Sequence, residues 1–108
     1  MKIASSLLRD IVSHRKHLGH SGLGTIYDAP ENLSCNWQPT VKTISNDRGE
    51  VEVATAEMMT GPDELLQVND AVIKDSRTYQ IIWVDTIKMY QRPHHIEALL
   101  QSIPSIPA

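Results

Sequence analysis

Apolar and polar residues alternate along much of the chain, and a period of two is typical of half-buried β-strands. In residues 33–44 the alternating apolar positions are Leu33, Cys35, Trp37 and Val41. Pro39 lies inside this segment and predicts a bend, because proline cannot donate a hydrogen bond to a neighbouring strand. The pattern therefore predicts one long, bent strand with one buried face.

The next segment, residues 50–59, has the same texture but changes phase. Val51 and Val53 alternate with glutamates, and a second apolar series then occupies the other phase at Ala54, Ala56 and Met58. This change predicts either a bulge or a strand whose far half is covered on its opposite face. The intervening Asn46-Asp47-Arg48-Gly49 is a turn signal, so the two segments are predicted to form a long hairpin.

Four further strands are predicted, at residues 25–27, 71–74, 78–87 and 93–101. The strand at 78–87 is apolar on nearly both faces, which is typical of a central strand or of one covered by a neighbour. Residues 63–66 are a candidate for a single helical turn, and residues 89–92 are predicted to be a loop.

The N-terminal segment, residues 7–18, fits either an amphipathic helix or a strand. Gly19, Gly22 and Gly24 follow it and predict an exposed, flexible loop. Residues 1–10 and 102–108 are expected to be extended terminal arms, the second because it contains two prolines.

Close-spaced strands without a βαβ rhythm predict a mainly β fold, a small antiparallel β-barrel or sandwich with a long hairpin. The length of 108 residues is typical of a single domain, so residues 1–108 are taken as one unit. Hydrophobic residues make up 41%, but aromatic residues only 5% and phenylalanine is absent. This thin core leaves apolar surface for partner chains to cover.

The charge pattern argues against tight binding to nucleic acid. The formal net charge is −3, whereas a domain that grips the DNA backbone needs clustered basic residues. No apolar run approaches the roughly 20 residues that cross a bilayer, and the N-terminus is too soon charged for a secretory signal. We therefore expect a soluble protein made in a cytoplasm, with no membrane partner.

No pattern typical of an active site is found. The chain lacks a nucleophile elbow, a phosphate loop, a dinucleotide fingerprint and a zinc-protease helix motif. Cys35 shares a predicted strand face with Leu33 and Trp37, which favours a buried thiol over a nucleophile. Glu50 and Glu52 fit a solvated strand edge. We expect no enzymatic activity and no cofactor.

Histidine is the residue type with the most chemical potential, since the chain has five. His14, His17 and His20 are spaced by three, but the glycines around His20 disfavour the helix that would align them for a metal ion. His94 and His95 are adjacent in a predicted strand and are therefore expected to point to opposite faces. A solvated basic loop and a structural role are the favoured interpretations, and no metal site is predicted.

The order of segments resembles the small head–tail connector proteins of long-tailed bacteriophages, in particular the head-closure or stopper proteins. The resemblance covers roughly residues 11–101 and is carried by Leu33-Ser34-Cys35-Asn36-Trp37, Asp47-Arg48-Gly49-Glu50, Ala54-Thr55-Ala56, Pro62-Asp63, Val68-Asn69-Asp70-Ala71-Val72-Ile73, the strand 79–84 and Pro93-His94-His95-Ile96-Glu97-Ala98-Leu99-Leu100. Asn69 departs from the glycine that usually precedes this aspartate, although asparagine tolerates similar backbone angles.

The resemblance implies a structural protein of the virion neck, assembled in the host cytoplasm. It implies a homo-oligomeric ring beneath the portal and its adaptor protein, above the tail terminator or tail tube protein. Such a ring closes the DNA channel after packaging, and genomic DNA passes through its lumen without specific binding.

Two segments are candidates for interface or gating roles. The first is the glycine-rich loop, with His17, Gly19, His20, Gly22 and Gly24. The second is the hairpin tip, with Asn46, Asp47, Arg48 and Gly49.

Two alternatives stay open. A tail terminator or another neck ring would differ from a stopper in the ring that it binds. A binding module of the oligonucleotide-barrel kind would need exposed aromatic residues interleaved with basic ones, whereas Trp37, Tyr79 and Trp83 lie among apolar residues, where burial is expected.

Overall fold

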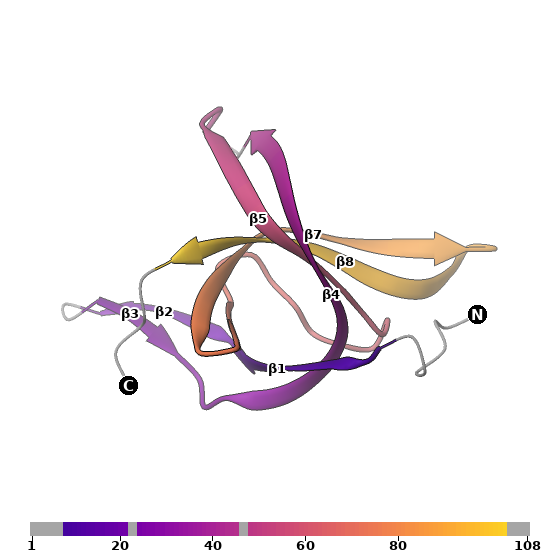
Figure 1. Ribbon diagram of the computed structural model, residues 1–108, viewed down its shortest axis with the longest axis horizontal. Coiled ribbons are helices and arrows are strands. Elements are labelled where there is room, and N and C mark those ends of the chain that lie inside the picture. Colours follow the sequence, from indigo (N-terminus) through magenta and orange to yellow (C-terminus); the bar gives the residue numbers. More distant parts are fainter. Residues whose placement is uncertain (1–7, 22–23, 46–47, 104–108) are drawn as a thin grey trace.

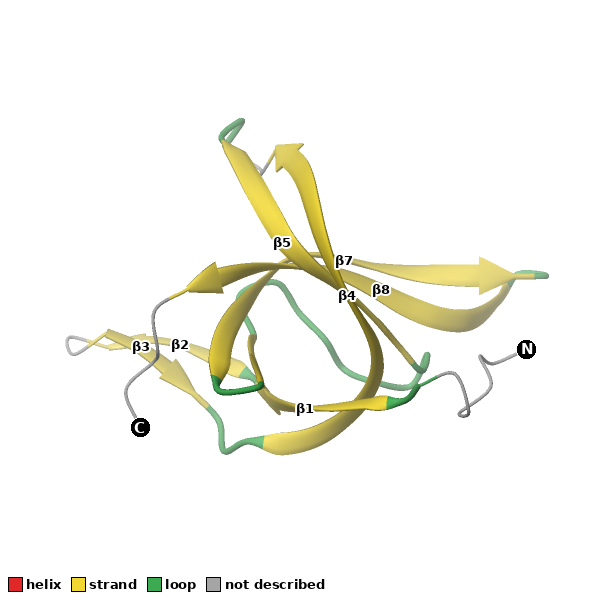
Figure 2. Cartoon of the chain, in the orientation of Figure 1, coloured by secondary structure: helices red, strands yellow, loops and turns green. Residues whose placement is uncertain are grey.

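Every regular element of the described chain is a β-strand (Figure 2). The computed structural model describes residues 8–21, 24–45 and 48–103. The strands are β1 (Asp10–Arg15), β2 (His17–Ser21), β3 (Gly24–Tyr27), β4 (Glu31–Ser45), β5 (Val51–Thr60), β6 (Ala71–Lys74), β7 (Arg77–Met89) and β8 (Arg92–Ile103). Within the segment predicted to be either helix or strand, 7–18, residues 10–15 and 17–18 belong to β1 and β2, and residues 8, 9 and 16 belong to no regular element. The helical turn predicted at residues 63–66 is wrong.

Six of the strands form a closed antiparallel barrel in the order β1-β4-β5-β8-β7-β6. The barrel closes where β6 pairs with β1, with Val72 opposite His14. The prediction of a mainly β antiparallel fold is confirmed, and of its two forms the barrel is the correct one. Within the barrel wall, closure removes the free sheet edges that an open sandwich would leave.

Three hairpins project from the barrel (Figure 1). The β2–β3 hairpin is a separate two-stranded sheet. The β4–β5 hairpin extends beyond the barrel because β8 pairs with β5 only through residues 56–60. The β7–β8 hairpin extends in another direction, because β6 covers only residues 77–80 of β7 and β5 only residues 96–100 of β8. In both long hairpins the projecting strands pair with each other alone.

β-Bulges direct the two long hairpins away from the barrel. In β4 the register shifts between Pro39 and Lys42, opposite Ala56 and Ala54, so β4 contains one extra residue near the predicted bend. Of the two interpretations of the phase change in β5, the strand whose far half is covered on its opposite face is correct: Ala54, Ala56 and Met58 are buried, whereas the valines at 51 and 53 are exposed on the other face. The bulge predicted for this pair therefore belongs to the partner strand.

A second bulge explains why β7 is apolar on both faces. Ile81 lies opposite Leu100 and Trp83 lies opposite Leu99, so Ile82 is the extra residue. Ile81 packs in the barrel interior, whereas Ile82 packs with Ala54 and Leu99 in a smaller cluster. The bulge thus lets consecutive isoleucines fill two different cores.

The larger core fills the barrel with short and medium side chains. Its buried members are Val12, Leu33, Cys35, Ala56, Met58, Leu66, Val72, Ile81, Ile96, Ala98 and Leu100. Trp37 and Tyr79 pack against this core, and their two rings contact each other edge to face with centroids 4.9 Å apart. Two partly buried rings therefore supply aromatic contact area to a core that contains no phenylalanine.

Candidate assembly interface

The base of the β2–β3 hairpin is fixed to the barrel by one buried carboxylate. Asp70, immediately before β6, accepts a hydrogen bond from the His17 amide at 2.8 Å through Oδ1. Its Oδ2 lies 2.8 Å from Nε2 of His14 and accepts a bond from the Gln67 amide at 3.0 Å. Asp70 is fully buried, so each of these bonds replaces a contact with water that folding has removed.

These hydrogen bonds determine the ionisation of Asp70. Burial by itself would raise the pKa of this carboxyl, but the bonds from His14, His17 and Gln67 outweigh it and lower the pKa below the ordinary value of 3.8. The carboxylate is therefore charged at neutral pH. It acts as a fixed acceptor that joins β1, the start of β2 and the loop before β6.

A second set of contacts holds the base of the β2–β3 hairpin on the side of β3, where the chain leaves the hairpin. Arg15 donates through Nε to the Asp28 carbonyl at 2.8 Å, and its guanidinium lies 5.8 Å from the centre of the Tyr27 ring. The Asp28 amide donates to the Lys16 carbonyl at 2.8 Å. Burial raises the pKa of Tyr27, so its hydroxyl stays protonated at neutral pH. The start of β2 and the end of β3 are thus both held at the barrel wall.

The glycine-rich segment was predicted to be a loop, and this prediction is wrong for most of it. His17, Gly19 and His20 belong to β2 and Gly24 begins β3, while Gly22 lies outside the described residues. Gly19 sits at a register shift with a φ of 136°, a conformation that residues with a Cβ rarely adopt. The glycine therefore permits an irregular hairpin.

The β4–β5 hairpin contains the second predicted segment. Arg48 and Gly49 lie at its turn, and Gly49 has a φ of 76°, whereas Asn46 and Asp47 fall outside the described residues. An exposed ion pair joins Arg48 and Glu50 at 3.9 Å. Val41 is 83% exposed on the same hairpin. The predicted long hairpin is confirmed, and its surface carries both exposed apolar and charged side chains.

Two grooves flank the place where the β4–β5 hairpin leaves the barrel. The first has a volume of about 380 Å³ and is lined by Ile44, Ser45, Arg48, Glu50, Glu52, Val68, Asn69, Gln80, Ile82, Trp83 and Val84. The second, of about 360 Å³, is lined by Asn36, Gln38, Lys42, Glu57, Met58, Met59, Trp83, Glu97, Ala98 and Leu99. Trp83 lines both grooves and is 36% exposed, so its predicted burial is wrong.

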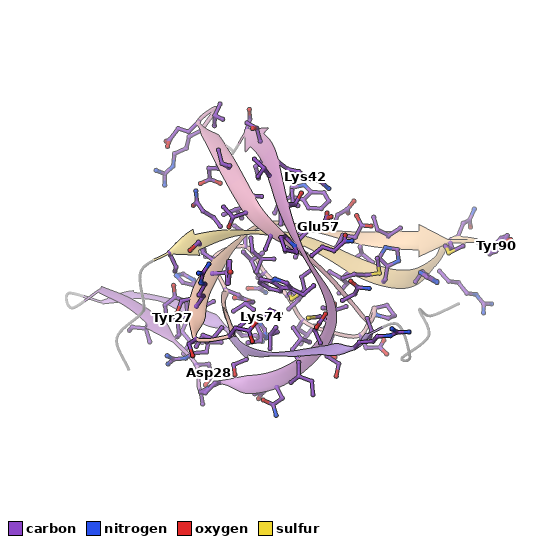
Figure 3. All side chains as sticks on the ribbon, viewed as in Figure 1. Tyr27, Asp28, Lys42, Glu57, Lys74 and Tyr90 are labelled. Carbon is purple, nitrogen blue, oxygen red and sulfur yellow. The ribbon has the colours of Figure 1, made fainter. Side chains whose placement is uncertain are left out.

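The β7–β8 hairpin was not predicted as a projecting element. Its two turn residues, Tyr90 and Gln91, both have positive φ, which is typical of a tight hairpin turn. The sequence lacks the Asn-Gly or Asp-Gly pair that signals this turn, and residues 89–92 were predicted to be a loop. Tyr90 lies at the far end of this hairpin and is 85% exposed (Figure 3).

The two adjacent histidines of β8 were predicted to point to opposite faces of the strand, and this prediction is wrong. Their Nδ1 atoms lie 2.7 Å apart, and Nε2 of His95 lies 3.1 Å from Oε1 of Glu97. The reason is a third bulge, since Ile87 pairs with His95 and Lys88 with Pro93, so His94 is the extra residue. Among the described residues no group of three His, Cys, Asp or Glu side chains is arranged to hold a metal ion.

Cys35 lies in the barrel core as predicted. Its side chain is fully buried, and burial, with a smaller contribution from the nearby Asp10 carboxylate, raises its pKa to about 12. A thiol in this state is not a nucleophile at neutral pH.

The geometry defines a class of small antiparallel β-barrel with projecting hairpins, exposed apolar side chains and grooves between the hairpins and the barrel. No model of a known protein family matches the sequence, and no curated protein matches it either. None of the described segments is a helix long and apolar enough to span a bilayer.

Proposed function

We propose that this chain is a structural protein of the bacteriophage neck: a head-closure ring subunit that seals the DNA channel after packaging and offers a docking surface to the tail. The observation that carries the proposal is the combination of a closed barrel with long hairpins whose projecting strands pair only with each other. Unpaired strand edges and exposed apolar side chains favour association with other chains.

The exposed apolar residues support this proposal because most of them lie on the projecting hairpins, although Ile11, Leu65 and Val68 are exposed elsewhere. Val41, Val51 and Val53 are exposed on the β4–β5 hairpin, and Met89 and Tyr90 are exposed on the β7–β8 hairpin. A ring subunit gains contact area with neighbours above, below and beside it.

The β2–β3 hairpin is our candidate for the element that closes the channel or contacts the adaptor ring. It projects as a separate sheet while Asp70 and Arg15 hold its two ends to the barrel wall. The turn of the β4–β5 hairpin, with Arg48 and Gly49, is our candidate for a contact with a neighbouring subunit or the tail. The weak net negative charge suits a lumen through which DNA has to slide.

Electron microscopy of particles made with this gene silenced tests the proposal. A head-closure role predicts unattached tails beside tailless heads that have lost their DNA. A complementary binding assay uses purified neck proteins: a stopper binds the adaptor ring, whereas a tail terminator binds the tail tube. Normal infectious particles would refute both ring assignments, and salt-sensitive binding to single-stranded DNA would then favour the binding-module alternative.

A deletion separates the role of the β2–β3 hairpin from the fold. Removal of residues 19–24 leaves all six barrel strands and the contacts of Asp70 with residues 14, 17 and 67. We expect a folded protein whose particles lose DNA or fail to join tails. Fully infectious particles would show that this hairpin has no part in closure or docking.

A further inference from the structure

The tip of the β7–β8 hairpin presents an aromatic side chain between two cations. Tyr90 is 85% exposed at the turn, and Lys88 and Arg92 flank it on the two strands. Neither cation forms an ion pair with a carboxylate of the described residues. Exposed tyrosine and arginine are characteristic of protein–protein contact sites.

The groove between the β4–β5 hairpin and β7 has the complementary character. Ile82, Trp83 and Val84 contribute its apolar side, Glu50 contributes a carboxylate from the turn before β5 and Glu52 one from β5. Arg48 also lines the groove and pairs with Glu50 at 3.9 Å, so the two carboxylates outnumber the one cation of the lining. The groove's volume of about 380 Å³ is large enough for an aromatic side chain and part of a second residue. The groove therefore offers an apolar seat for a ring and negative charge for the cations beside it.

From this match we infer that the tip of the β7–β8 hairpin of one copy docks into the Trp83 groove of a second copy of this chain. Tyr90 packs against Trp83, and Lys88 and Arg92 face Glu50 and Glu52. The inference rests on the proposed ring function and names the surfaces that join neighbouring subunits.

The occupant has to come from another copy because the hairpin cannot reach its own groove. Trp83 lines the groove, and β7 continues for six residues beyond it to Met89. At about 3.3 Å per residue the tip lies roughly 20 Å away from the groove in the same chain. Figure 1 also shows the β4–β5 and β7–β8 hairpins leaving the barrel in different directions.

Such a contact joins two different surfaces, so it is heterologous. After the first contact the pair keeps one unused tip on one copy and one unused groove on the other, and addition of copies continues until the rotation between them closes a ring. A single type of contact is thus sufficient to build the ring.

Disulfide cross-linking of the full-length chain tests the contact. Cys35 is buried, so introduced cysteines are the only accessible thiols of the described residues. One preparation contains Gln91→Cys, an exposed turn position beside Tyr90 that leaves Tyr90 in place, and a second contains Val68→Cys, in the groove lining but outside the apolar and acidic positions that the contact uses. In the matched control, a Ser34→Cys protein is used in place of the Val68→Cys protein; Ser34 is exposed on β4 and does not line the groove.

Mixed and oxidised at high concentration, the Gln91→Cys and Val68→Cys proteins should form mostly mixed dimers, and the control pair should not. Reversal of both cations, Lys88→Glu with Arg92→Glu, should reduce mixed dimers at least about tenfold, and Glu50→Lys with Glu52→Lys in the groove partner should restore them. Cross-linking no greater than in the control pair, or dominated by links between two Gln91→Cys chains, would overturn the contact. Either result would leave the neck function to be decided by the gene-silencing experiment.

Discussion

Replacement of Asp70 by asparagine is the sharpest test of how the β2–β3 hairpin is held. The carboxylate accepts three hydrogen bonds: one at Oδ1 from the His17 amide, and two at Oδ2, from His14 and from the Gln67 amide. Asparagine has nearly the same shape but only one acceptor oxygen and no charge. In either orientation of the amide, at least one backbone N–H faces an NH₂ group and loses its partner.

The magnitude follows from these three contacts. A hydrogen bond to a charged group contributes about 1.5–3 kcal/mol, and an unsatisfied buried donor costs about 1–3 kcal/mol. One lost bond and the loss of charge at the remaining bonds together predict a destabilisation of about 2–4 kcal/mol. This is a large part of the 5–15 kcal/mol that is typical of a small domain.

The assay is urea unfolding at pH 7, followed by circular dichroism. Asp85→Asn is the matched control, because Asp85 is exposed on β7 and its replacement is expected to change stability by no more than about 0.5 kcal/mol. If Asp70→Asn unfolds within about 0.5 kcal/mol of the unsubstituted protein, the carboxylate does not hold the hairpin as described.

Three further predictions follow from the same structure. The pKa of the Asp70 carboxyl is lower in the folded protein than in the unfolded chain, so the charged carboxylate stabilises the fold fully above about pH 4 and less as the pH falls through the pKa of the folded protein. The difference in unfolding free energy between the unsubstituted protein and Asp70→Asn, measured in urea, should therefore become smaller below about pH 4. Cys35, with its pKa raised to about 12, should not react with a thiol reagent at pH 8 until denaturant is added, and rapid labelling of the native protein would contradict its burial. In a Trp37→Phe variant Trp83 is the only tryptophan; its emission should shift to the blue as protein concentration rises, and the shift should be absent when Tyr90→Ala is added. A shift that persists with Tyr90→Ala would contradict the proposed contact.

The barrel was predictable because it depends on local alternation. Leu33, Cys35 and Trp37 share one face in the sequence pattern, and in the structure the first two are buried and the third packs against the same core. The order of strands around the barrel and the choice of barrel over sandwich depend on pairings between distant segments, which alternation does not contain.

The interface was less predictable because its geometry depends on single extra residues. Ile82 and His94 are bulge residues, and each alters which face its neighbours occupy; the errors over Trp83 and the histidine pair both occur at these positions. The partners of Asp70 were equally hidden, since His14 is 56 positions away in the sequence. The local sequence sign beside Asp70 was Asn69, at the position where glycine is usual, and Asn69 has a φ of 80° in the structure.

The closure of the barrel between β1 and β6 also has a consequence for how the chain folds. β4–β5 and β7–β8 are hairpins of neighbouring segments and can form early, whereas the β1–β6 pairing and the contact between His14 and Asp70 join residues 56 to 60 positions apart. The closing seam therefore forms late, with a slow rate typical of non-local β-topologies. Until it forms, the edges of β1 and β6 remain open to pairing with other nascent chains, so aggregation during synthesis should begin at this seam.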